Sequence, residues 1–381
     1  MILPDLVERR TNSKRTNTKG YDTMKLGIVG LPNVGKSTLF NALTGSHAET
    51  GAYSNAAAKP NIGQAKVPDS RLDWLTEYYH PKKTTPATID FVDVVGIKKG
   101  GGRGNAYLQT IRLVDALVHI VRCFENDEMF TEPADAARDA DNLAVELILA
   151  DIEVVERRLD KANKAAKSGE KKAKREIEMC KGLLDHLLEG KPAASYEFTE
   201  EDKDILQDGG LLSVKPVIYV ANMAEDDIAN YAEHPQYKAL AAIAADQGAA
   251  VLPVAAKFEE EIMEMDDEDA AMFMEELGLT ERGLDRLIHA SYDLLGYISF
   301  LTGGEDEVRA WTITKGTKAP RAAGKIHSDI ERGFIRAETV AFDDLVACGT
   351  VANAKAKGLF RSEGKEYVMK DGDIVNFLFN V

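Results

Sequence analysis

Residues Gly30–Ser37 read G-L-P-N-V-G-K-S; the apolar run Leu26–Val29 precedes them and a helix-forming run, Thr38–Leu43, follows. The pattern G-x-x-x-x-G-K-[ST] between a strand and a helix predicts a phosphate-binding P-loop. Backbone N–H groups of such a loop point at phosphate oxygens, and the helix N-terminus adds positive dipole potential. We expect Lys36 to reach the β- and γ-phosphates and the Ser37 hydroxyl to bind Mg2+. The alternative is a glycine-rich turn that only packs; the context favours a site for a nucleoside triphosphate.

The bulk composition predicts a cytoplasmic protein of more than one domain. The chain has 381 residues, 44% of them hydrophobic and 29% charged, which allows two or three domains with a substantial core. No apolar stretch approaches the roughly 18 residues of a membrane span, and the scattered cysteines indicate a reducing compartment. Residues 1–23 lack the apolar core of a secretory signal, and we expect them to form a disordered tail. The net charge of −16 argues against bulk coating of nucleic acid, and no DNA specificity is expected.

Strand and helix signals alternate in the N-terminal part of the chain and return after residue 214. Such alternation predicts an α/β fold, with a mostly parallel sheet and helices on both faces. Residues 24–123 and 214–303 are therefore expected to form one nucleotide-binding domain. The expected strands are Lys25–Val29, Ile62–Val67, Thr88–Val92, Ala116–Arg122, Val217–Val220 and Ala250–Val254, and the expected helices are Lys36–Gly45, Asp69–Tyr79, Tyr107–Leu113 and Pro235–Gln247.

Residues 124–213 interrupt this alternation with two amphipathic runs on either side of Lys167–Glu170. Their apolar residues recur at helical spacing, which predicts an inserted antiparallel helical hairpin. Cations cluster at its expected tip, between Lys161 and Arg175, and either form a solvated face or bind RNA. They are Lys161, Lys164, Lys167, Lys171, Lys172, Lys174 and Arg175.

Residues 304–381 have the pattern of a small separate domain, a sheet crossed by one helix. Asp371–Asp373 (D-G-D) is a strong turn signal before the last strand. The expected strands are Val308–Ile313, Phe334–Val340, Glu366–Met369 and Val375–Phe379, with a helix over Pro320–Ile330.

A P-loop site needs a second carboxylate at the end of a nearby strand, and Asp90–Gly96 (D-F-V-D-V-V-G) supplies it. Asp93 ends an apolar run, and Gly96 follows at the D-x-x-G spacing, where its N–H can approach the γ-phosphate. Many GTPases place a Gln after this glycine to orient the attacking water. Residue 97 is Ile97, which has no hydrogen-bonding atom and cannot do so. His119 is the nearby imidazole, and it either takes part in hydrolysis or is a polar group satisfied within the sheet.

The choice of base depends on Asn222–Glu225, which reads N-M-A-E after the strand at 217–220. The guanine-selective form is N-K-x-D, whose Asp accepts hydrogen bonds from guanine. Here Met223 replaces the Lys, and the extra methylene of Glu225 displaces the carboxylate. Because sites built on such hydrogen bonds discriminate by orders of magnitude, we predict a preference for ATP over GTP. Ala255 and Ala256 lie where the loop flanking the base is expected.

These motifs, together with H-I-V-R-C-F-E-N-D, E-V-R-A-W-T-I, A-A-G-K-I-H-S-D and the terminal K-D-G-D-I-V-N-F-L-F-N-V, resemble the YchF/Obg-like ATPases. The resemblance covers residues 24–381. It implies a P-loop NTPase domain with an inserted helical hairpin and a C-terminal ubiquitin-like β-grasp (TGS) domain. It also implies Mg2+-dependent, ATP-preferring hydrolysis and association with the ribosome, at the large subunit or the subunit interface, and with ribosomal RNA. Carried over to this sequence, ATP contacts fall on Asn33, Val34, Gly35, Lys36, Ser37, Thr38, Gly96, Asn222, Met223, Glu225, Ala255 and Ala256, metal contacts on Ser37 and Asp93, and catalytic roles on Lys36 and His119.

The switch segments depart from the family pattern in two places. Ala57 stands where the family's switch I holds a Thr that closes on Mg2+, and alanine cannot ligate a metal. The loop after Gly96, Lys98–Gly104, is shorter than the usual form. Two functions therefore stay open: a slow ATPase accelerated by a ribosomal partner, and a nucleotide-gated ribosome or RNA adaptor with negligible turnover. A GTPase is a third interpretation, against which N-M-A-E argues.

Overall fold

The computed structural model describes residues 24–45, 61–94, 106–167, 171–206 and 210–380. These residues divide into two compact units, described here one at a time: the first contains 24–64 and 90–287, the second 65–89 and 288–380. Within these ranges, no helix has both the length and the apolar character needed to cross a membrane.

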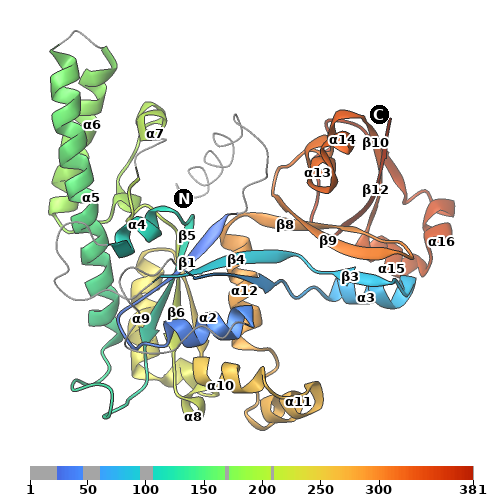
Figure 1. Cartoon of the computed structure of the whole chain (residues 1–381), viewed down its shortest axis with the longest axis horizontal. Coiled ribbons are helices and arrows are strands. Elements are labelled where there is room, and N and C mark those ends of the chain that lie inside the picture. The colour runs from blue at the N-terminus through green and yellow to red at the C-terminus, as the bar shows by residue number, and fades with distance from the viewer. Residues whose placement is uncertain (1–23, 46–60, 95–105, 168–170, 207–209, 381) are drawn as a thin grey trace. The chain divides into compact units, whose positions relative to one another are not determined.

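The first unit is built on a six-stranded sheet in the order β2-β4-β1-β5-β6-β7; Figure 1 labels its strands β1, β4, β5 and β6. The strands from β4 across to β7 all pair in parallel. Central strand β1 is buried on both faces, which explains its continuous apolar sequence. The α/β prediction is confirmed, and β4 and β6 run on to the polar residues Asp93 and Asn222. The strands are β1 (Lys25–Val29), β2 (Asn61–Lys66), β4 (Thr88–Asp93), β5 (Ala116–Arg122), β6 (Val217–Asn222) and β7 (Ala250–Val254).

Helices cover this sheet and bury its apolar side chains. Helix α2 begins at Lys36, directly after the P-loop, and buries Leu39 and Phe40. The apolar side chains of α4 and α5 pack with Val29 and Leu117 of the sheet. The helices of this unit are α2 (Lys36–Thr44), α4 (Ala106–Arg112), α5 (Ala136–Ala166), α6 (Lys171–Leu188), α7 (Glu200–Leu206), α8 (Glu225–Ile228), α9 (Pro235–Asp246), α10 (Ala256–Ile262) and α11 (Asp267–Glu276); α12 (Gly283–Leu294) begins in it.

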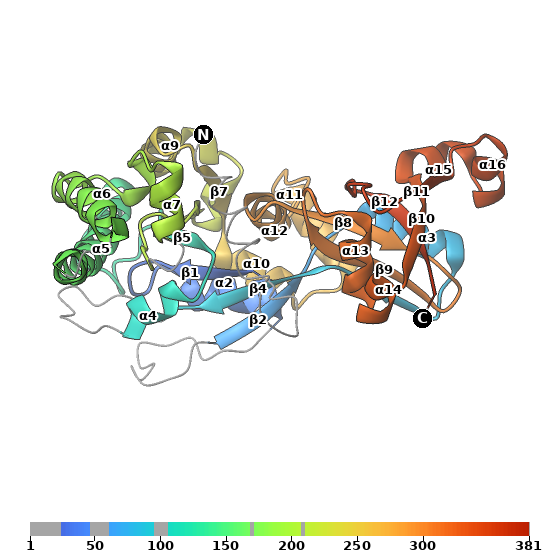
Figure 2. The ribbon, with the colours of Figure 1, turned by 90° about the horizontal axis from the view of Figure 1, so that it is seen from above.

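The predicted helical hairpin is confirmed: α5 and α6 lie side by side (Figures 1 and 2). Their seam is apolar and includes Val155, Met179 and Leu183. Midway along α5, the Asp151 carboxylate accepts hydrogen bonds from Leu212 N, Ser213 N and Ser213 Oγ at 2.6–2.8 Å. The hairpin is thereby joined to the segment that leads back to β6.

The second unit contains a sheet in the order β11-β10-β12-β8-β9-β3. Strand β12 pairs in parallel with β8, and the hairpin β8–β9 is antiparallel. The order β9-β8-β12-β10-β11, with helix α13 after β9, is that of a β-grasp sheet, as the resemblance implies. Its strands are β3 (Lys83–Thr85), β8 (Tyr297–Thr302), β9 (Glu307–Thr314), β10 (Phe334–Ala341), β11 (Arg361–Glu363) and β12 (Asp373–Phe379), and its helices are α3 (Ser70–Tyr79), α13 (Ala319–Ile326), α14 (Ser328–Arg332), α15 (Phe342–Cys348) and α16 (Val351–Ala356).

Two elements of this unit were predicted wrongly. The expected helix Pro320–Ile330 is two helices, α13 and α14, because His327 is extended (φ −161°, ψ 144°) and its side chain caps α14 by accepting from Asp329 N. The expected strand Glu366–Met369 contributes only an isolated bridge from Val368 to Lys318. The strand at the edge beside β10 is β11.

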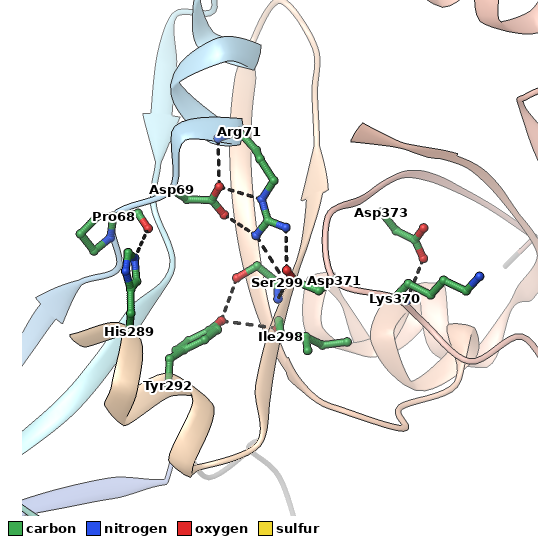
Figure 3. Close-up of polar contacts among 10 residues, drawn as sticks. All are labelled: Pro68, Asp69, Arg71, His289, Tyr292, Ile298, Ser299, Lys370, Asp371 and Asp373. Atoms are coloured by element: carbon green, nitrogen blue, oxygen red, sulfur yellow. Dashed lines mark hydrogen bonds and ion pairs between the residues drawn. The ribbon is translucent and has the colours of Figure 1, made fainter. Parts of the chain in front are cut away.

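Residues 65–89 belong to this second compact unit, although the sequence placed them in the nucleotide-binding domain. The C-terminal segment of the unit starts at 288, whereas the expected boundary of the C-terminal domain was 304. Strand β3 extends the sheet by pairing with β9. Figure 3 shows Arg71 of α3 between Asp69 and Asp371, with guanidinium–carboxylate distances of 2.8 and 2.6 Å. Asp371 also accepts from Ser299 N (2.8 Å). The D-G-D turn therefore anchors α3 as well as starting β12.

Candidate functional site

The P-loop backbone adopts a conformation that requires glycine at two positions. Gly30 and Gly35 have φ values of 154° and 98°. A Cβ atom on Gly30 would lie 2.5 Å from Ile120 O, and one on Gly35 would lie 2.4 Å from Asn222 Nδ2. The loop is therefore packed tightly against the ends of β5 and β6. Asn33, with φ 62°, is exposed in this loop, whereas Val34 is buried and offers only its backbone.

The structure brings Lys36, Ser37 and Asp93 together. Strand β4 pairs with β1 so that Asp93 lies beside Ile28, just below the P-loop. Ser37 Oγ donates a hydrogen bond to Asp93 Oδ2 (3.2 Å), and Lys36 Nζ donates to Leu31 O (2.7 Å). Sequence-distant groups predicted to share one site thus lie within a few ångströms of each other.

Burial sets the electrostatics of this cluster. It lowers the pKa of Lys36 to about 8, although the neighbouring Asp93 acts in the opposite direction. Burial also raises the pKa of Asp93, against the effects of Lys36 and of the Ser37 hydrogen bond. Burial thus disfavours the charged form of both side chains. A nearby negative charge would stabilise charged Lys36, and a nearby positive charge would stabilise charged Asp93. A polyanion with a divalent cation supplies both signs.

The oxygens of Ser37 and Asp93 fit Mg2+. This ion prefers hard oxygen ligands and is often bound by one or two protein groups, waters and substrate phosphates. Among the described residues, no group of three or more His, Cys, Asp and Glu side chains could hold a metal alone. Ser37 and Asp93 would then be the protein groups at the ion, and waters and nucleotide phosphates could complete its shell.

Asn222 links three parts of the site. Its side chain is 5% exposed; Nδ2 donates to Val34 O of the P-loop (2.8 Å), and Oδ1 accepts from Ala256 N (3.0 Å). The end of β6, the P-loop and the start of α10 are thus held by one amide. Beside it, the Met223 side chain is buried in the apolar core, while Glu225 is exposed at the start of α8. Ala255 and Ala256 are buried next to this link.

His119 lies within the sheet, in β5 between Val29 and Tyr219. Its side chain is 3% exposed, and its ring centroid is 5.3 Å from that of Tyr219. Burial, reinforced by Lys36, lowers the pKa of His119 to about 3. The imidazole is therefore neutral at physiological pH and could orient a group by a hydrogen bond while carrying no charge itself.

Several predicted switch residues lie outside the described residues: Ala57, Gly96, Ile97 and the loop Lys98–Gly104. Residues 1–23 lie outside as well.

At the hairpin tip, Arg175 differs from its lysine neighbours. Its guanidinium group binds Asp202 of α7 at 2.9 and 2.7 Å and Thr199 at 3.1 Å, so it supports the hairpin. Four lysines of the run have exposed side chains: Lys161, Lys164, Lys167 and Lys174. The remaining cationic surface thus consists of lysines.

The sequence motifs assign no role to Arg122, the last residue of β5. It is 3% exposed and lies beside Asn222 in the parallel pairing. The signal was available: a second charged or titratable residue, after His119, interrupts an otherwise apolar strand. Such a residue is rarely buried without a specific partner.

Comparisons with known proteins agree with this geometry. Residues 25–156 match the family model described as "50S ribosome-binding GTPase", and residues 297–380 match the C-terminal YchF-GTPase model described as "Protein of unknown function (DUF933)". The chain is 50% identical over 361 residues to "Ribosome-binding ATPase YchF" of Bacillus subtilis, with 93% of this chain and 99% of that protein covered. It is 39% identical to "Obg-like ATPase 1" of Oryza sativa, with 94% and 92% covered. The solved structure of the Schizosaccharomyces pombe YchF GTPase superposes with a TM-score of 0.83 at 35% identity, over 95% of this chain and 99% of that one.

Proposed function

The chain belongs to the YchF family of ribosome-binding ATPases, and we propose that it binds ATP in preference to GTP, hydrolyses it slowly with Mg2+, and acts on the ribosome in the cytoplasm. One observation carries the proposal. Lys36, Ser37 and Asp93 converge at the carboxyl edge of the parallel sheet, and Asn222 ties the P-loop to the segment expected to read the base. Open parallel sheets bind their ligands at this edge.

The phosphate half of the site would use the P-loop from Asn33 to Thr38. Its backbone N–H groups and the start of α2 face a polyanion, and Lys36 adds a full positive charge. Ser37 would bind Mg2+ directly and Asp93 through water, in line with the hydroxyl–carboxylate contact between them. When bound, Mg2+ neutralises charge that develops on the phosphate oxygens. Gly96 is proposed as a further γ-phosphate contact.

The base half would use Asn222, Glu225 and the loop at Ala255 and Ala256. Met223 would contribute through its backbone, because its side chain is committed to the core. Glu225 is exposed and presents a carboxylate one methylene longer than the guanine-reading Asp. This difference supports the preference for ATP.

The residue types at the positions expected to act in the chemical step support slow turnover. Ile97 cannot orient water, and intrinsic rates in this superfamily are about 10⁻⁴ to 10⁻² per second without such help. His119 is our candidate for an orienting role, as a neutral imidazole. His119→Ala is then expected to lower kcat while the ATP dissociation constant stays unchanged. Equal loss of ATP binding would instead indicate a packing role against Tyr219.

Two measurements test the proposal. The first is the dissociation constants for ATP and GTP with Mg2+, with Lys36→Ala as the control that removes the phosphate contact. The second is steady-state ATPase activity with and without ribosomes. Comparable constants for the two nucleotides, or tighter GTP, would contradict the base assignment.

A nucleotide-gated adaptor with negligible turnover is the second candidate function. Ala57 at the switch I position and Ile97 at the water-orienting position favour it. Tight ATP binding combined with background hydrolysis, with and without ribosomes, would select the adaptor over the enzyme.

The exposed lysines at the hairpin tip are proposed to contact ribosomal RNA, at the large subunit or the subunit interface. Phosphate contacts make such binding strongly salt-dependent. Reversal of Lys161, Lys164, Lys167 and Lys174 to Glu is expected to weaken co-sedimentation with ribosomes and to flatten its salt dependence. Lys357→Glu, at an exposed lysine of the second unit, is the control for a general charge effect. Unchanged salt dependence in the tip variant would show that the tip is only a solvated face.

A further inference from the structure

Arg122 is a buried cation at the edge where the nucleotide is proposed to bind. It ends β5, where Cys123 N donates to Asn222 O (2.8 Å) and Arg122 is paired in register with Asn222. Residues paired in register on neighbouring strands project to the same face of a sheet. Arg122 and Asn222, whose amide holds the P-loop, therefore share one face.

The guanidinium group is enclosed by the loop that follows β5. Its Nη2 donates to Glu132 O (3.0 Å), its Cζ lies 3.9 Å from the ring centroid of Phe130, and its Nη1 is 3.8 Å from Glu125 Oε2. Nη1 is buried and has no hydrogen-bond partner among the described residues. A buried N–H group without a hydrogen-bond partner is costly, so packing alone does not explain an arginine here.

Residues 124–134 form a folded loop around this group. The Glu125 carboxylate accepts from Ala134 N (3.0 Å), which closes the loop at its base. The Asn126 side chain accepts from the backbone N–H groups of residues 128 and 129. Phe124 contacts Phe130 edge-to-face, with centroids 6.3 Å apart. The loop thus has a defined conformation whose centre is the arginine.

We propose that Arg122 is a positioning residue of the nucleotide site, which fixes loop 124–134 beside the base-reading segment that starts at Asn222. The inference rests on the proposed nucleotide-binding function and deepens it. The loop leaves the carboxyl edge one residue after β5, next to Asn222, where ligands of open parallel sheets bind. Arg122 does not have to contact the nucleotide. It fixes loop 124–134, which would line one side of the base site, and it has no role in the P-loop at Gly30–Ser37.

The test separates the base half of the site from the phosphate half. Dissociation constants are measured for Mg2+-ATP and for Mg2+-tripolyphosphate, which lacks the base and ribose. Arg122→Met keeps an unbranched apolar stem and removes the guanidinium group. We expect ATP binding to weaken roughly tenfold, about the cost of ordering one or two loop side chains on binding. Tripolyphosphate binding should change less than twofold, and Arg122→Lys should restore part of the ATP affinity.

Arg138→Ala is the matched control. Arg138 also contacts Glu132, through the carboxylate at 2.9 Å, but it lies on the surface of α5. It should leave the affinities for both ligands within twofold of the wild-type values. If Arg122→Met does not fold, Phe130→Leu, which removes the ring from the guanidinium group, gives the same comparison.

The outcomes are distinct. A selective loss of ATP affinity supports the positioning role. Equal losses for both ligands, or no loss, overturn it while the proposed function stands. Failure of the wild-type protein to bind either ligand would overturn the proposed function itself.

Discussion

Lys36 should make ATP binding depend on pH above neutrality. The side chain is 8% exposed, and burial lowers its pKa to about 8, with Asp93 opposing the shift. The free protein would therefore be about nine-tenths charged at this lysine at pH 7 and about one-tenth charged at pH 9. ATP phosphates favour the ammonium form, so the pKa of Lys36 rises when ATP binds.

The size of the effect follows from the two protonation states. If the pKa in the complex lies above about 10, the dissociation constant for ATP increases about tenfold from pH 7 to pH 9, equivalent to about 1.4 kcal/mol. Binding at pH 8 should take up about half a proton. For the free protein, the unfolded chain binds more protons at this lysine between pH 8 and its ordinary pKa of 10.5. The contribution of Lys36 to the free energy of unfolding therefore increases as the pH rises through that window.

Isothermal titration calorimetry of Mg2+-ATP binding, at pH 8 in two buffers with different ionisation enthalpies, measures the proton uptake. Lys36→Arg is the control, because a guanidinium group stays charged throughout this range. Proton uptake should disappear in that variant even if its affinity is lower. A wild-type dissociation constant that is flat from pH 7 to pH 9, or uptake that persists in Lys36→Arg, would refute the reasoning.

Three substitutions test the contacts that hold the fold and the site together, each by urea denaturation. Asn222→Ala leaves a buried carbonyl and a buried N–H without partners, so the free energy of unfolding should fall by about 2–4 kcal/mol; a loss under about 1 kcal/mol would mean that the amide is not the link between the P-loop and β6. Asp151→Ala removes three short hydrogen bonds from a fully buried carboxylate and should cost about 3 kcal/mol, against less than about 0.5 kcal/mol for Glu153→Ala on the exposed side of the same helix; similar costs for the two would contradict the anchoring role. Arg71→Ala should cost about 1–2 kcal/mol, because its side chain is only 25% exposed, and should speed hydrogen exchange in residues 65–89. Lys82→Ala, at an exposed ion pair, should cost at most about 1 kcal/mol; unchanged exchange in Arg71→Ala would show that other contacts hold the segment.

The sequence predicted the nucleotide-binding sheet well because its strands carry strong local signals. A strand buried on both faces must be apolar throughout, and the run Leu26–Val29 before Gly30 meets this requirement. The P-loop adds steric requirements that few other sequences meet, as the close approach of Gly35 to Asn222 shows. The convergence of Ser37 and Asp93 follows from parallel pairing of β1 and β4, which the alternation of strands and helices already indicates.

Tertiary pairing could not be predicted in the same way. The helix at 70–79 was expected, but its local pattern does not say which sheet it joins; that depends on Arg71 meeting Asp371, 300 residues away. The strand expected at Glu366–Met369 fails for a related reason. Its residues have strand propensity, but the edge of β10 is already paired with β11. Strand propensity alone does not form a strand when no neighbouring strand offers backbone hydrogen bonds.

The polar residues at the ends of β4, β5 and β6 lead us to expect that ATP binding and ATP hydrolysis separate in this site. Asp93, Arg122 and Asn222 end otherwise apolar strands, and each is held by protein contacts. Such a site is organised before a ligand arrives, which favours tight binding because little ordering remains to be done. The chemical step is less well served: the residue type of Ile97 has no hydrogen-bonding atom to orient water, and His119 is neutral and packed against Tyr219. A rate enhancement must then come from a group that a partner supplies or repositions. ATP hydrolysis by this chain should therefore respond to the ribosome much more strongly than ATP binding does.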